Sequence, residues 1–161
     1  MIEELKNKSI EDQMKILKTI ENIPKVEYTG IEKIIYNAID NGYEIYFNSP
    51  KQIRKLKFIK YAVEKGQTNA FTYLIYEEND KEKLDKTVYE AIDKGYKLNE
   101  YTPKIIKQFK YIKYAIEKGQ DRTLNLIDTE SLSKEEYTEL EEILYQQLKK
   151  GNDIIKFIQK N

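Results

Sequence analysis

The chain has 161 residues, which is enough for one domain or one short repeat array. Its 28 basic and 28 acidic residues leave no net charge, which argues against a general polyanion binder. Because Cys and His are both absent, disulfides, thiolate or imidazole catalysis and Cys- or His-ligated metal sites are excluded.

The sequence has no stretch approaching 18 consecutive apolar residues, and residues 1–8 lack the apolar core of a signal peptide. We therefore expect a soluble, cytoplasmic protein without membrane contact, cofactor or metal. The aromatic residues are 14 Tyr and 5 Phe, with no Trp. Because a Tyr ring can be buried while its hydroxyl stays solvated, this composition favours the thin layers of a repeat stack.

The N-terminal segment is predicted to be helical. Ser9 and Asp12 have the spacing of a capping box. The helix that they open is expected to end near Asn22, before Pro24. We assign residues 1–30 to an N-terminal cap.

Residues 31–67 and 84–120 are two copies of one sequence. When they are aligned with a shift of 53 residues and no gap, 19 of 37 positions are identical. Many of the others exchange similar side chains, such as Val63 and Ile116. A repeat of this kind predicts an array of helical units in which each unit packs against its neighbour.

The first helix of each copy is expected at about residues 31–41 and 84–94. It ends at Gly42 or Gly95, where glycine can adopt a positive φ angle at little cost. An extended connector follows, and its alternation of apolar residues is too brief to build a sheet.

The second helix is expected to begin at Ser49–Pro50 and Thr102–Pro103, with a hydroxyl N-cap followed by Pro in the first turn. It ends at Gly66 or Gly119. A third, shorter helix is expected after each of these glycines, near residues 70–78 and 123–128.

The C-terminal segment contains a further helix signal. Ser133 and Glu136 form a second capping box, for a helix that ends at Gly151. The run of residues 145–158 is similar to residues 60–74, so we interpret the segment as a degenerate third unit. A terminal unit must present one face to water, which explains its divergence.

The predicted fold is therefore all-α, a compact helical-repeat stack with an internal 53-residue duplication. We expect a single helical domain over residues 1–161. Its parts are an N-terminal cap, two repeat units and a degenerate C-terminal unit, at residues 1–30, 31–83, 84–132 and 133–161.

The second helix of each copy has an apolar stripe and an opposite basic face. At 100° per residue, Ile53, Leu56, Ile59 and Val63 form the stripe of the first copy, and the second copy repeats it. The opposite face is named here the basic ridge. Its candidate partner-binding residues are Lys51, Arg54, Lys55, Phe58, Tyr61, Lys104, Lys107, Tyr111 and Tyr114.

Two interpretations of the basic ridge are open. Its lysines and rings could bind phosphates, bases or a protein partner. Alternatively, the rings pack against the neighbouring unit and the lysines form a solvated edge, as charges on helices often do.

Acidic residues also occupy repeated positions. Asp40 and Asp93 precede the first glycines, but neither has a second acid or a His with which to share a metal. We expect each carboxylate to accept hydrogen bonds from loop amides or from a Tyr hydroxyl of the adjacent unit. The acidic cluster at residues 135–142 is expected to complement a helix N-terminus and to pair with a basic ridge, within the chain or between chains.

The sequence contains no catalytic motif. Glycine-rich phosphate loops and a nucleophile elbow are absent, and no His or Cys can act as a base or nucleophile. Paired carboxylates of the glycosidase type are formally possible, although no substrate cleft is implied. We therefore expect no enzyme activity and assign no catalytic residue.

The run FIKYAVEKGQ at residues 58–67 resembles the second helix of an ankyrin repeat. The Ser/Thr-Pro pair at the expected start of the second helix resembles the same feature in short helical-repeat proteins of bacteria and large viruses. The resemblance covers about residues 31–130, but the ankyrin Thr-Pro-Leu-His signature is missing and a 53-residue period is too long for one such unit. It implies a helical-repeat fold and no particular function.

The sequence therefore predicts a non-catalytic protein-binding module. Its bias toward Lys, Ile, Asn, Glu and Tyr is typical of AT-rich bacterial or phage genomes. This bias suggests a phage- or mobile-element-encoded inhibitor of a bacterial host protein. The alternative function is nucleic-acid binding through the basic ridges, which would depend strongly on salt.

Overall fold

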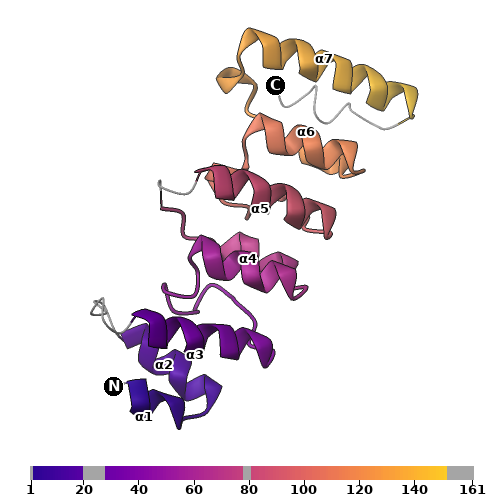
Figure 1. Cartoon of the computed structure of the whole chain (residues 1–161). Coiled ribbons are helices and arrows are strands. Elements are labelled where there is room, and N and C mark those ends of the chain that lie inside the picture. The colour runs from indigo at the N-terminus through magenta and orange to yellow at the C-terminus, as the bar shows by residue number, and fades with distance from the viewer. Residues whose placement is uncertain (1, 20–27, 78–80, 152–161) are drawn as a thin grey trace. The chain divides into compact units, whose positions relative to one another are not determined.

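The structure, a computed structural model, describes residues 2–19, 28–77 and 81–151 (Figure 1). Across these residues the regular elements are α-helices and 3-10 helices without a β-strand, which confirms the predicted all-α class. Lys55 and Ile75 make one isolated bridge between connecting segments. The chain divides into two compact units, Met1–Tyr96 and Lys97–Asn161, which are described separately below.

Unit 1 contains five α-helices and one 3-10 helix among the described residues. They are α1 (Ile2–Lys6), α2 (Ile10–Thr19), α3 (Tyr28–Asp40), α4 (Leu56–Glu64), η2 (Thr68–Tyr73) and α5 (Lys81–Asp93). Helix α4 contacts both α3 and α5, so these three helices lie side by side in chain order (Figure 1).

Unit 2 is built around α6, which packs against the 3-10 helix that follows it. Its described elements are η4 (Lys104–Ile106), α6 (Phe109–Glu117), η5 (Asp121–Leu126), η6 (Thr129–Ser131) and α7 (Lys134–Lys149). Helices α5, α6 and η5 begin and end 53 residues after α3, α4 and η2. This offset is the one that relates the two similar stretches of sequence.

The predicted apolar stripes lie in the core. Ile53, Leu56, Ile59 and Val63 are all buried in unit 1. The equivalent residues of unit 2 are buried as well: Ile106, Phe109, Ile112 and Ile116. Full burial of such a side chain stabilises the fold by about 1.5–3 kcal/mol. These stripes therefore hold α4 and α6 in place.

The predicted start of the second helix is wrong in both copies. Helix α4 begins at Leu56, after a turn, and in unit 2 the short helix η4 is separated from α6. The Ser49 hydroxyl accepts a hydrogen bond from the Tyr46 amide at 3.0 Å, and Thr102 does the same for Asn99 at 3.0 Å. Each hydroxyl closes the preceding turn instead of capping a helix, and the Pro that follows is compatible with either role.

The other local predictions have mixed outcomes. The third helix of each copy is a 3-10 helix, η2 or η5, placed earlier in the chain than expected. The Ser133–Glu136 capping box is confirmed at the start of α7. Ser9 accepts from the Asp12 amide at 3.2 Å, but its hydroxyl donates to the Asp12 carboxylate, so the reciprocal bond of a capping box is replaced. The predicted end of this helix near Asn22 lies outside the described residues, as does the second half of the run 145–158.

The glycines end helices as predicted. At the end of α4, Gly66 has φ +92° and donates to the Val63 carbonyl at 3.0 Å. Gln67 then donates to the Ala62 carbonyl at 2.8 Å, which completes a Schellman motif. The same pair of bonds ends α3, α5 and α6, where the glycines also have positive φ: Gly42, Gly95 and Gly119.

We expect Gly66→Ala to lower the free energy of unfolding by about 1 kcal/mol, because alanine is strained at this φ. Apart from its own chain neighbours, no heavy atom lies within 4 Å of the place that a Cβ would take, so the loss comes from the backbone and not from a collision. Urea denaturation measures the change. Gly66→Asn is the matched control and should lose less, because Asn tolerates the left-handed region better. An alanine variant as stable as the wild type would contradict this account.

Candidate functional site

The extended connector after α3 is closed by a glutamine from the end of α4. Gln67 accepts a hydrogen bond from the Ile45 amide at 3.3 Å and donates to the Tyr43 carbonyl at 3.0 Å. In unit 2, Gln120 accepts from the Leu98 amide at 3.1 Å. These bonds satisfy backbone groups that have no neighbouring strand. This role was not predicted from the sequence, where its only signal is the identical Gln after the second glycine of each copy.

The connector leads into a tight turn at residues 46–49, named here the aromatic turn. Ser49 is buried and shares a hydrogen bond with the Tyr43 hydroxyl at 3.0 Å, in addition to its bond from the Tyr46 amide. Burial raises the pKa of Tyr43 to about 12, so this hydroxyl is protonated at neutral pH. Phe47 lies at the tip of the turn with 71% of its surface exposed.

Arg54 binds the backbone of the aromatic turn through its guanidinium group. Its Nε donates to the Tyr73 carbonyl at 2.8 Å, and its Nη1 donates to the Phe47 carbonyl at 3.0 Å. The guanidinium carbon also lies 5.5 Å from the centroid of the Phe47 ring. In unit 2, Lys107 donates to the Glu100 carbonyl at 2.5 Å, which is the equivalent bond 53 residues later. Both cations were predicted to bind a partner. In the structure both instead donate hydrogen bonds to a backbone carbonyl of a turn.

The rings of the basic ridge are not all on the surface. Phe58 is 2% exposed and Tyr111 is 0% exposed, so neither is available to a partner in this structure. The physical reason is their position beside the apolar stripe, where Phe58 meets the ring of Tyr36 from α3 with centroids 5.2 Å apart. Tyr61 and Tyr114 are half-buried.

Tyr61 links the end of α3 to α4. Its hydroxyl donates to Asp40 at 2.8 Å, and its ring meets Tyr36 edge-on at 4.8 Å. Lys65 pairs with the same carboxylate at 2.6 Å. The hydrogen bonds from Lys65 and then Tyr61 hold the pKa of Asp40 below its usual value. The expected bond from a Tyr hydroxyl is thus present, although the Tyr belongs to the same repeat copy and not to an adjacent one.

The remaining cations of the basic ridge lie at the surface. Lys51 and Lys104 are exposed. Lys55 pairs with Glu77 at 3.0 Å. The residues of the predicted basic ridge therefore do not form one surface. Two of the rings are in the core, two of the cations hold turns, and the remaining lysines lie at the surface.

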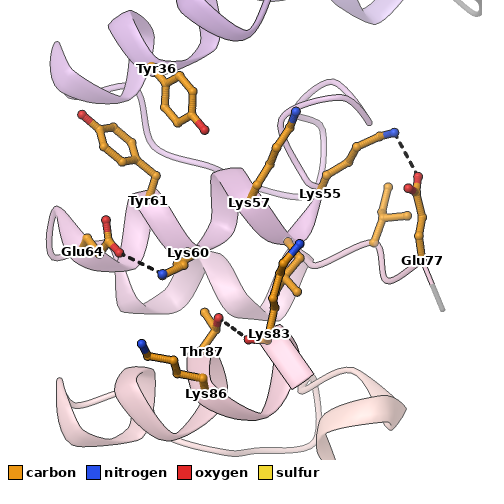
Figure 2. A pocket seen from close by; sticks show the side chains of 12 residues that line it. Tyr36, Lys55, Lys57, Lys60, Tyr61, Glu64, Glu77, Lys83, Lys86 and Thr87 are labelled. Atoms are coloured by element: carbon orange, nitrogen blue, oxygen red, sulfur yellow. Dashed lines mark hydrogen bonds and ion pairs between the residues drawn. The ribbon is translucent and has the colours of Figure 1, made fainter. Parts of the chain in front are cut away.

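A groove of about 560 Å³ runs along α3, α4 and α5 in unit 1 (Figure 2). Tyr36, Tyr61 and Leu56 contribute its apolar and aromatic lining. Five lysines and two glutamates supply its charge: Lys55, Lys57, Lys60, Lys83, Lys86, Glu64 and Glu77. The sequence analysis found Lys55 and Tyr61 of this set but missed the groove, because it depends on which helices become neighbours.

Unit 2 has a corresponding groove of about 680 Å³ between α6 and α7. On its walls, Lys113 of α6 pairs with Glu139 of α7 at 2.8 Å. Glu139 of the acidic cluster thus pairs with the second helix of a repeat copy, through Lys113, which is not one of the basic ridge residues. The hydrogen bond that Lys113 donates to Glu139 raises the pKa of Lys113.

No family model, curated protein or solved structure matches the chain. Within the described ranges, no three acidic side chains gather where they could hold a metal ion. None of the helices described there combines the length and apolar character needed to cross a membrane. The resemblance to ankyrin-like repeats therefore stays a prediction.

We expect Arg54→Met to lower the free energy of unfolding by about 1–3 kcal/mol, because it removes two bonds to backbone carbonyls. Lys51→Met removes the same charge from an exposed position nearby and should change stability by less than about 0.5 kcal/mol. Urea denaturation of both variants makes the comparison. Equal losses would show that charge, and not the two bonds, accounts for the effect.

Proposed function

We propose that this chain is a duplicated helical unit that acts as a non-catalytic protein-binding module. The duplication is supported by the 19 identities in 37 positions and by the common 53-residue offset of the helices. The equivalent bonds of Gln67 and Gln120, and of Arg54 and Lys107, support it further.

The observation that carries the binding function is the exposed aromatic turn. Phe47 is 71% exposed on a turn whose backbone is fixed by Ser49 and Arg54. A large ring on a preorganised backbone loses little conformational freedom on binding, and such rings dominate protein interfaces. In unit 2, Tyr101 is 73% exposed on the corresponding turn. Both turns therefore present an exposed ring on a fixed support.

Nucleic-acid binding is the weaker candidate. It requires a row of cations free to meet phosphates. Arg54 and Lys107 instead donate to backbone carbonyls, and Lys55 pairs with Glu77. We therefore treat nucleic-acid binding as an outcome that the following test can reveal.

We expect Phe47→Ala to weaken a protein complex by about 30-fold, the effect of losing one interface hot spot. The tagged full-length chain would be used to capture partners from a lysate of a low-GC bacterium, with quantification by mass spectrometry. Tyr137→Ala is the control, because it removes a half-exposed ring that belongs to α7 and not to either turn. The melting temperatures of both variants should stay close to that of the wild type.

Two results would overturn the assignment of binding to the aromatic turn. One is recovery of the same proteins by the wild type and by Phe47→Ala. The other is binding of a short duplex or single strand with a steep salt dependence that the Phe47 variant leaves unchanged. The second result would replace protein binding by nucleic-acid binding.

A further inference from the structure

Equivalent lysines of the two units have different partners. Lys60 of α4 and Lys113 of α6 are 53 residues apart and have the same neighbours, Tyr-Ala, on their C-terminal side. In unit 2, Lys113 pairs with Glu139 of the following helix at 2.8 Å. In unit 1, the carboxylate nearest to Lys60 is Glu64 of its own helix, at 3.6 Å. This lysine therefore pairs with the following helix in unit 2 and within its own helix in unit 1.

The following helix explains the difference. In unit 2, α7 brings Glu139 and Glu142 to the groove. In unit 1, α5 brings Lys83 and Lys86, which extend toward α4 in Figure 2. Cations thus line both walls of the unit 1 groove, whereas opposite charges face each other in unit 2.

We propose that the unit 1 groove binds an acidic segment of a partner protein, whose carboxylates take the place that Glu139 takes in unit 2. This inference rests on the proposed protein-binding function and names the chemistry of the partner. The carboxylates reach Lys60 from the side of α5 and approach Lys86 on the opposite wall.

The ion pairs of the two lysines that the ligand would reach do not block this binding. Lys60 pairs with Glu64 at 3.6 Å and Lys86 with Glu90 at 4.0 Å, and all four side chains are more than a third exposed. Exposed pairs of this kind contribute little to stability, so a ligand carboxylate can exchange with them. A ligand that reduces the repulsion between two cationic walls also gains a faster encounter from the surrounding field.

The lining favours a protein segment over a nucleic acid. Glu64 and Glu77 lie among the lysines and would repel a continuous row of phosphates. A peptide can space its carboxylates between them. Tyr36 and Tyr61 offer aromatic surface for an apolar side chain of the same segment.

A peptide with the sequence of residues 134–149 is a suitable probe, because it carries the carboxylates that unit 2 uses. We expect the fluorescently labelled peptide to bind the full-length chain, and the same peptide with its five Glu replaced by Gln not to bind. Lys60→Glu combined with Lys86→Glu should weaken binding by about 10-fold or more. Lys33→Glu combined with Lys81→Glu makes the same change of charge outside the groove and should leave the affinity within about twofold.

A milder pair, Lys60→Gln with Lys86→Gln, keeps the test informative if charge reversal disturbs folding, and should give an intermediate loss. Circular dichroism and melting temperature verify the fold of each variant. The proposal is overturned if the peptide does not bind at about 1 mM, if the Gln peptide binds equally well, or if the lysine variants bind like the wild type. It is also overturned if a short duplex binds through the same lysines, or if they mediate a concentration-dependent dimer instead.

Phe47→Ala separates this inference from the proposed function. The variant should bind the acidic peptide normally, because Phe47 does not line the groove. If the acidic peptide fails to bind the groove but Phe47→Ala still loses its protein partners, the groove is removed as a site and the aromatic turn stays the binding surface. An unchanged capture of partners by Phe47→Ala, together with normal peptide binding, would instead remove the turn and leave the groove.

Discussion

Each unit of this protein depends on closing a stretch of backbone that runs extended between two helices without a strand beside it. Backbone amides and carbonyls near the core must find partners, or the fold loses free energy for each group left unsatisfied. In unit 1 the partners are side chains: Gln67 binds the connector at Tyr43 and Ile45, and Ser49 and Arg54 bind the turn after it. The connector is therefore held by side-chain hydrogen bonds, although it has no regular structure of its own.

The second copy meets the same requirement with slightly different chemistry. Gln120 repeats the bond to the connector, Thr102 replaces Ser49, and Lys107 replaces Arg54. Because an ammonium group is more compact than a guanidinium fork, one Arg can join two separated carbonyls where Lys suits a single contact. The residues that close the two turns are thus similar, while the exposed residues at the tips of the turns differ: Phe47 in unit 1 and Tyr101 in unit 2. A constant support with a variable tip is an arrangement suited to recognition.

Sequence reasoning predicted the features that depend on local signals. The helix-ending glycines, the apolar stripes and the Ser133 cap each follow from spacing within a few residues, and all are present. The start of the second helix was wrong because a hydroxyl before Pro can close a preceding turn as well as cap a helix. The bridge from Gln67 to Ile45 spans 22 residues and leaves no periodic pattern, so it could not be predicted. The lysine-lined groove likewise depends on which helix lies next to α4.

The central claim is that side chains from the end of each second helix hold the connector of the same copy. Amide hydrogen exchange measured by NMR tests it most directly, in the wild type and in Gln67→Met. With the amide of core residue Ile59 as the reference, the Ile45 amide should exchange about 10-fold faster in the variant. The Leu98 amide, held by Gln120, should keep its wild-type rate. Unchanged exchange at Ile45, or equal acceleration at Ile45 and Leu98, would contradict the account.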